Sequence, residues 1–142
     1  MEYLLDHWPV LSGLRMALRT EPNVRTAVLF GSVARGAETE HSDIDLLIEL
    51  DNDSIADVAQ LEARLEYGLG RQVQVVRWSE ARTKAPFLYT VLQEGRPVLD
   101  RDGTWKKIGN RRHQLKRQAE ARRTEQSRTA RAALDSLGDS SS

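Results

Sequence analysis

Apolar residues recur along this chain with two different periods, which indicate helices and strands in alternation. Near the N-terminus they are spaced by three or four residues, and this spacing predicts an amphipathic helix over Tyr3–Arg19. Two compact apolar runs follow at Val24–Phe30 and Ile44–Leu50, as is typical of buried strands. The polar segment between them, Gly31–Ser42, contains two glycines and predicts a turn together with one helical turn.

A second group of elements continues the alternation. Ser54 followed by Asp57 resembles a capping box, in which side chains satisfy the free amide groups at a helix start. Apolar residues at helical spacing continue to Leu69, and Gly70 provides a stop. The remaining predicted elements are a strand over Gln72–Trp78, a helix over Ser79–Glu94 and a short strand at Val98–Leu99.

The order of these elements predicts an α/β (α+β) fold, a compact mixed sheet with helices packed on one side. We place this domain at residues 1–104, because the composition changes at Trp105. Beyond it, apolar residues are thinly spread among Arg, Lys and Gln. This pattern predicts a long basic helix to Leu137 and a disordered end at Gly138–Ser142. The chain is therefore expected to have a folded body and a helical extension, residues 105–142.

The net charge of zero hides a strong asymmetry between these two parts. Residues 1–104 contain 11 Lys/Arg and 17 Asp/Glu, a net charge of −6, whereas residues 105–142 contain 10 and 4, a net charge of +6. The density of cations over 105–131 is high enough to contact nucleic acid through phosphates, but no aromatic residue follows Trp105 to stack on single strands. Three interpretations of this extension remain open. It is a solvated helix, a helix that binds a partner protein, or a helix that contacts nucleic acid.

The composition excludes several classes of site. There is no cysteine, which excludes disulfides, thiolate metal sites and a cysteine nucleophile. No stretch approaches the ~20 apolar residues of a membrane span. The first residues also lack the basic start and apolar run of a secretory signal. We therefore expect a cytoplasmic protein with no membrane contact.

The candidate chemistry lies at the junction of the first two predicted strands. Gly31-Ser32-Val33-Ala34-Arg35-Gly36 follows the first strand, and Asp43 and Asp45 begin the second, with ten residues between Ser32 and Asp43. Glycine lets backbone amides approach a phosphate closely, and the serine hydroxyl adds a donor. Carboxylates two residues apart on a strand point to the same face, roughly 7 Å apart at their Cα atoms. This arrangement suits Mg²⁺ bound together with substrate phosphates.

This run resembles the G-S-x10-D-x-D signature of the minimal nucleotidyltransferases of the DNA polymerase β-like superfamily. The resemblance extends over about Val24–Asp100, since the helices and strands follow the same order. It implies that Gly31 and Ser32 hold the phosphates of ATP or another nucleoside triphosphate. It also implies that Asp43 and Asp45 are the catalytic residues and bind Mg²⁺.

The sequence departs from the family pattern at one position. The family places a third carboxylate on the next core strand, where this chain has Val73-Gln74-Val75-Val76. Gln74 can offer a neutral oxygen to a metal but cannot act as a base, and a lost general base costs on the order of 10²–10⁴-fold in rate. Glu80 and Glu49 are the alternative carboxylates.

Two further residues near the motif have alternative interpretations. Arg35 either reaches the phosphates, as a nucleotide-binding residue, or pairs with a nearby acid. His41 either lines the site or is a solvated loop residue. The sequence contains no P-loop and no dinucleotide-binding glycine pattern.

The resemblance implies an enzyme that transfers a nucleoside monophosphate, which we expect to be AMP, to a hydroxyl group. The short chain is similar to stand-alone minimal nucleotidyltransferases that act as antitoxins by modifying a cognate HEPN-type toxin, with a tyrosine hydroxyl as the expected acceptor. The alternative is a catalytically impaired antitoxin that binds nucleotide and neutralises its partner by contact, and Gln74 favours it. A nucleic-acid-binding regulator that works through the extension is a third hypothesis.

Overall fold

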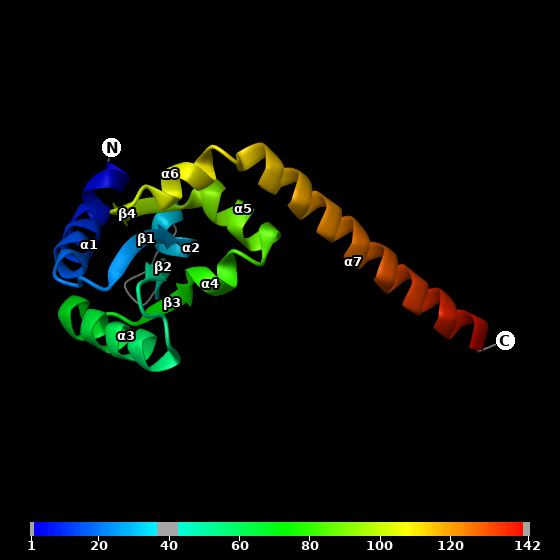
Figure 1. Ribbon diagram of the computed structural model, residues 1–142, viewed down its shortest axis with the longest axis horizontal. Coiled ribbons are helices and arrows are strands. Elements are labelled where there is room, and N and C mark those ends of the chain that lie inside the picture. Colours follow the sequence, from blue (N-terminus) through cyan, green and yellow to red (C-terminus); the bar gives the residue numbers. More distant parts are fainter. Residues whose placement is uncertain (1, 37–42, 141–142) are drawn as a thin grey trace.

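The computed structural model describes the backbone of residues 2–36 and 43–140, and the side chains within 10–36 and 43–134. The elements are, in order, α1 (Glu2–Arg19), β1 (Val24–Phe30), α2 (Gly31–Arg35), β2 (Ile44–Leu50), α3 (Ile55–Leu69), β3 (Val73–Arg77), α4 (Trp78–Ala81), α5 (Ala85–Glu94), β4 (Arg96–Asp100), α6 (Thr104–Gly109) and α7 (Arg112–Ser140). Figure 1 shows the strands enclosed by helices, with α7 extending well beyond the rest of the chain.

The strands form one mixed sheet in the order β3-β2-β1-β4. β1 pairs antiparallel with both β2 and β4, whereas β2 and β3 are parallel and are connected through α3. The predicted mixed sheet is therefore confirmed. Its two central strands are the ones with continuous apolar runs, and the short strand expected at Val98–Leu99 is present within β4.

Helices cover both faces of this sheet, so the prediction of helices on one side is wrong. One face packs against α1 and α3, with Leu29, Leu46 and Leu61 in the shared core. The opposite face packs against α5 and α7 and includes Val28 and Leu47. Because side chains alternate along a strand, neighbouring apolar residues must face opposite ways. The uninterrupted apolar runs of β1 and β2 were the signal for two covered faces.

Two helices that the sequence predicts as continuous are divided. The helix expected over Ser79–Glu94 consists of α4 and α5. Pro86 lies in the first turn of α5, where the missing N–H of proline costs no helical hydrogen bond. The basic helix expected from Trp105 is likewise divided into α6 and α7.

The first part of α7 packs on the folded body. Leu115 and Ala119 are buried, and Trp105 and Ile108 of α6 pack against the same core. α7 then continues to Ser140, three residues beyond the predicted helix end at Leu137, while 141 and 142 lie outside the described residues. Within the part of the chain that the structure describes, no helix is long and apolar enough to cross a membrane.

Candidate active site

The turn between β1 and α2 is shaped by Gly31. Its φ of 76° lies in the left-handed region, which glycine adopts without steric cost. A Cβ at this position would also overlap the carboxylate of Asp45. α2 is anchored on the core by the buried side chains of Val33 and Ala34, and Ser32 is partly exposed in its first turn. The backbone of the turn and the Asp45 carboxylate are therefore in direct contact.

Asp43 and Asp45 lie at the start of β2 and share one face of the sheet. Asp45 is in register with Phe30 at the end of β1 and with Gln74 on β3. By strand alternation both carboxylates lie on the same face as Leu47, which packs towards α5. The structure thus brings Gly31 into contact with Asp45 and places Asp43 close enough to Asp45 to affect its charge.

The two carboxylates affect each other electrostatically. Burial raises the pKa of the Asp45 carboxyl, and the neighbouring charge of Asp43 raises it further, whereas Arg35 lowers it. The ionised form of Asp45 is therefore less stable than that of a solvated aspartate. A cation bound between the two carboxylates would remove this disadvantage.

Gln74 faces the same site from β3. Its Nε2 donates a long hydrogen bond of 3.4 Å to Asp43 Oδ2. The amide therefore lies beside Asp43 and in register with Asp45. Among the described residues, no group of three or more His, Cys, Asp or Glu could hold a metal ion.

Neither alternative carboxylate lies at this site. Glu80 pairs with Arg77, which also lowers the pKa of Glu80. Glu49 accepts hydrogen bonds from Thr26 and Thr104. It lies four residues along β2 from Asp45, or about 13 Å at strand spacing. The hypothesis that Glu49 or Glu80 replaces the third acid therefore has no support in this geometry.

Arg35 is paired with an acid that sequence reasoning did not identify. Its Nη1 lies 3.2 Å from both carboxylate oxygens of Glu94, at the end of α5. The Glu94 side chain is 23% exposed and that of Arg35 is 51% exposed. No local pattern could indicate this contact, because the two residues lie on elements far apart in the chain. His41 and Ser42 fall outside the described residues.

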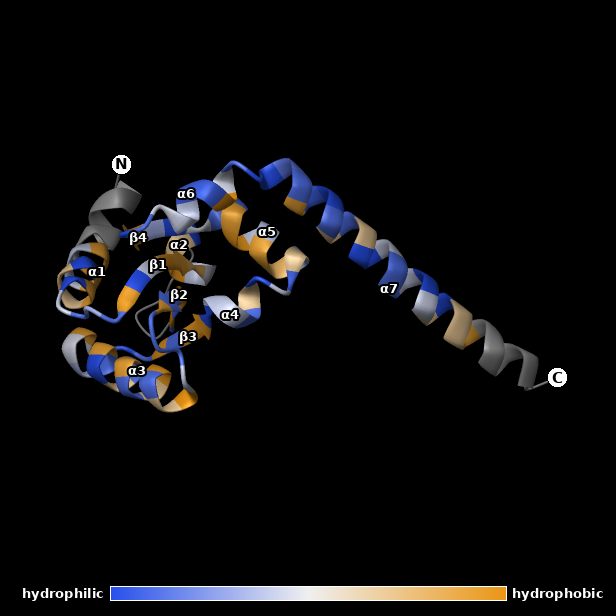
Figure 2. Cartoon of the chain, viewed as in Figure 1, coloured by the Kyte–Doolittle hydropathy of each residue, from blue (hydrophilic) through white to orange (hydrophobic). Residues whose placement is uncertain are grey.

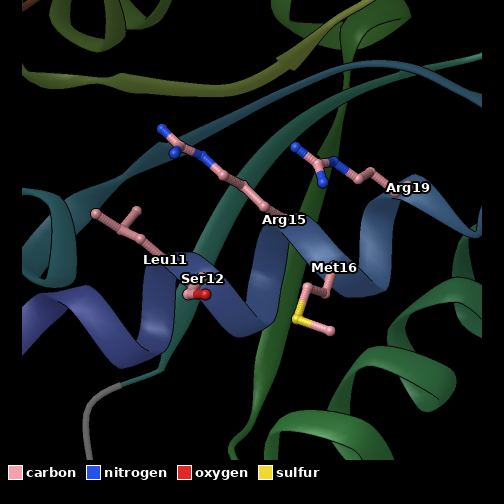
Figure 3. Close-up of a pocket in the computed structure, with 5 residues that line it drawn as sticks. All are labelled: Leu11, Ser12, Arg15, Met16 and Arg19. Carbon is pink, nitrogen blue, oxygen red and sulfur yellow. The ribbon is translucent and has the colours of Figure 1, made fainter.

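A hollow in the described surface lies on α1. It has a volume of about 180 Å³ and is lined by α1 residues that include Arg15 and Arg19 (Figure 3). α1 packs on the sheet face opposite the two aspartates. The hollow contains no carboxylate and is separate from the Gly31–Asp45 site.

Comparison with known proteins agrees with this geometry. Residues 13–104 match the family described as polymerase beta, nucleotidyltransferase. The match includes the Gly31 turn, both aspartates and Gln74, and it spans more than half of the chain. The chain belongs to this nucleotidyltransferase family.

Two proteins are similar to this nucleotidyltransferase in sequence. A putative protein adenylyltransferase of Methanocaldococcus jannaschii is 34% identical over 79 residues, which cover 54% of this chain and 79% of that protein. The protein adenylyltransferase MntA of Thermococcus cleftensis is 35% identical over 86 residues, which cover 60% of this chain and 85% of that protein.

Solved structures share the fold of this nucleotidyltransferase. A chain of a toxin–antitoxin complex with AMP-PNP has a TM-score of 0.66 at 19% identity, covering 84% of this chain and 97% of that chain. A chain of a complex between tri-AMPylated Shewanella oneidensis HEPN toxin and MNT antitoxin has a TM-score of 0.58 at 17% identity, covering 90% and 98%. At such identities the likeness shows the fold alone, and the expected polymerase β-like core is confirmed.

Proposed function

We propose that this nucleotidyltransferase transfers AMP from ATP to a hydroxyl group of a partner protein, and that it acts as the antitoxin of a HEPN-type toxin. The observation that carries the proposal is the contact of Asp45 with the Gly31 turn, beside Asp43. It places Asp45 directly against a turn that can approach phosphates, with Asp43 two residues away at the start of the same strand. The two relatives named as protein adenylyltransferases support AMP and a protein acceptor. Chains of toxin–antitoxin complexes with the same fold support the partner.

We assign Mg²⁺ to Asp43 and Asp45. The donor set fits this ion, because Mg²⁺ prefers one or two carboxylates together with substrate phosphates. Burial and the charge of Asp43 raise the pKa of Asp45, and a bound cation would offset both effects. When bound, the ion would offset the negative charge that develops as pyrophosphate leaves.

Gly31, Ser32 and Arg35 hold the triphosphate in this proposal. Gly31 has no side chain to obstruct the phosphate, and the Ser32 hydroxyl can donate to a phosphate oxygen. Arg35 already affects the charge of Asp45, so its guanidinium is close enough to the acids to act on the same ligand. Its contact with Glu94 is exposed enough to be exchanged for a phosphate oxygen.

The transfer requires one bond to form and one to break. The acceptor oxygen bonds to the α-phosphorus, the bond from that phosphorus to the bridging oxygen breaks, and pyrophosphate leaves. The proton of the acceptor hydroxyl passes to solvent, since the Gln74 amide cannot accept it. We expect the acceptor to be a tyrosine of the partner, whose phenol ionises more readily than an aliphatic hydroxyl.

A second candidate is an antitoxin that binds nucleotide without transferring it. The position of Gln74 favours this function. Its side-chain amide lies beside Asp43, where the family pattern has a third carboxylate. Neither Glu49 nor Glu80 supplies a carboxylate in its place. The intact Gly31 turn with Asp43 and Asp45 favours the transferase.

Incubation with α-labelled ATP, CTP, GTP and UTP and Mg²⁺ distinguishes the two functions. Each nucleotide is tested with and without the protein encoded beside this chain, and label is located by gel and mass spectrometry. If this chain is a transferase, label from ATP is expected on the partner protein. Tight binding of the two proteins with no label on either contradicts it and supports the non-catalytic antitoxin.

A further inference from the structure

The outer part of α7 is an isolated helix. From Glu120 to Leu134 every side chain is exposed, and Figure 1 shows this length extending away from the sheet and its helices. Arg122 still reaches back to the body, where its Nη1 donates to the carbonyl oxygen of Thr83 at 2.8 Å. Beyond that contact, the hydrogen bonds of the described residues up to Leu134 lie within the helix itself, such as those from the Thr124 and Thr129 hydroxyls to carbonyl oxygens one turn earlier. Such a helix is marginal in water unless a ligand or partner stabilises it.

The charges of α7 are concentrated on one side, here named the basic face: Arg112, Lys116, Arg117, Arg123, Arg128 and Arg131. At 3.6 residues per turn, these six side chains lie within about 160° of the helix circumference. Between residues 112 and 131, Glu120 is the one acid on this side, so this length of the basic face carries five net positive charges. The opposite side carries Arg122 and Glu125, together with Leu115 and Ala119 where α7 packs on the body.

Most of these cations have no partner among the described residues. Lys116, Arg117, Arg123, Arg128 and Arg131 are exposed, and none makes a hydrogen bond or ion pair with another described residue. Arg117 and Arg128 are separated by three helical turns and lie on one line along the helix, about 16 Å apart. The basic face is therefore a row of available cations.

A protein partner fits this face poorly. Interface cores between proteins are depleted in charge and enriched in aromatic residues. Between residues 120 and 134 there is no aromatic residue, and Leu134, 69% exposed, is the one apolar side chain larger than alanine. Figure 2 shows the same length of α7 as predominantly hydrophilic. Docking on a protein would bury little apolar surface.

A polyanion fits it better. Phosphates along a nucleic-acid backbone are met by regularly placed Lys and Arg, and the release of counterions drives binding without apolar contact. The absence of aromatic residues removes the stacking that single strands require. Residues 1–104 carry a net charge of −6, which disfavours a long nucleic-acid backbone on their surface, so contact with a duplex would be made by the projecting helix.

We propose that the basic face of α7 binds the phosphate backbone of a nucleic-acid duplex, without reading its bases. The proposal does not depend on nucleotide transfer, because α7 contributes no residue to the Gly31–Asp45 site. A nucleotidyltransferase without transfer activity could still bind a duplex, and the reverse also holds. DNA and RNA duplexes share the recognised chemistry, and the experiment compares them.

The test is fluorescence anisotropy of the full chain with labelled DNA and RNA duplexes of one sequence, over a series of salt concentrations. The wild-type chain is expected to bind at low salt and to weaken steeply as salt rises. The Arg117→Gln, Arg128→Gln double variant is expected to bind more weakly and to flatten the log–log salt slope by about 2. Both substitutions lie on exposed helix, so circular dichroism is expected to be unchanged.

The matched control is Arg15→Gln with Arg19→Gln, which removes the same charge from exposed positions on α1. It is expected to leave the salt slope unchanged. Absence of duplex binding at low salt overturns the proposal, as does an equal loss in both double variants, because attraction would then depend on net charge alone. If instead the α7 variant loses only its partner protein, the basic face is a protein interface and the proposal is wrong.

Discussion

Gly31 and Asp45 touch across the first two strands, and a Cβ on Gly31 would occupy the space of the Asp45 carboxylate. The contact links the backbone of the turn to one of the two acids, so the turn and the acid keep a fixed relative position. A substitution at Gly31 must therefore alter the site as well as the turn.

Gly31→Ala is expected to destabilise the fold and to abolish nucleotide binding. Part of the effect is the strain of a positive φ in a residue with a Cβ, about 1–3 kcal/mol. Gly70→Ala is the control, because Gly70 has a φ of 68° and nothing within 4 Å of an added Cβ. Denaturant unfolding and ATP calorimetry should show a moderate stability loss and normal ATP affinity for Gly70→Ala. Equal effects of the two variants on ATP affinity contradict the role of the Gly31–Asp45 contact.

Substitutions in the Arg35–Glu94 pair distinguish two roles of Arg35: a contact with the phosphates of ATP and an ion pair that only supports the structure. Arg35→Gln is expected to weaken ATP affinity about tenfold or more, the effect of losing a charged hydrogen bond. Glu94→Gln breaks the same ion pair but leaves the guanidinium in place, so ATP affinity should be retained. If both variants weaken ATP binding equally, Arg35 acts only through Glu94 and does not contact the phosphates.

Gln74→Asp is expected to raise the rate of AMP transfer. The new carboxylate would face Asp43 and could hold metal or accept the acceptor's proton, an effect on the order of 10²-fold for a general base. Gln118→Asp on α7 adds the same charge at an exposed position away from the site. Single-turnover rates with ATP and the partner measure the difference. A lower rate in Gln74→Asp means that the amide itself is required.

The boundary of the folded body can be tested with two leucines of α7. We propose that residues 105–119 are part of this body, since Leu115 is buried while Leu134 is 69% exposed. Leu115→Ala is expected to cost about 2–5 kcal/mol of unfolding free energy, and Leu134→Ala close to none. Similar values for the two variants in denaturant unfolding would place the boundary before α7.

Much of this architecture could be predicted from periodicity. The central strands, the capped helix after Ser54 and the positions of Asp43 and Asp45 depend on local patterns, and each is present. The two covered faces were missed although the apolar runs indicated them, because both sets of alternate side chains were assigned to one core. The division of the helix before Pro86 was missed as well, although proline in a first turn marks a helix start.

Long-range contacts could not be predicted in the same way. The partner of Arg35 lies on α5, and the Glu49 carboxylate is bonded by Thr26 and Thr104 on two other elements. Both contacts depend on how strands pair and helices pack, which no single segment encodes. The proximity of Gln74 to Asp43 was inferred from the family pattern, because the residues around Gln74 do not by themselves indicate this contact.

The most direct test of the central claim is isothermal calorimetry of ATP with Mg²⁺ on the full chain and on the Asp43→Asn, Asp45→Asn double variant. The control is Asp51→Asn with Asp53→Asn, two acids with the same spacing just beyond β2. The account predicts Mg²⁺-dependent binding in the wild type and the control, and none in the Asp43, Asp45 variant. Unchanged ATP affinity in that variant would contradict the assignment of the site.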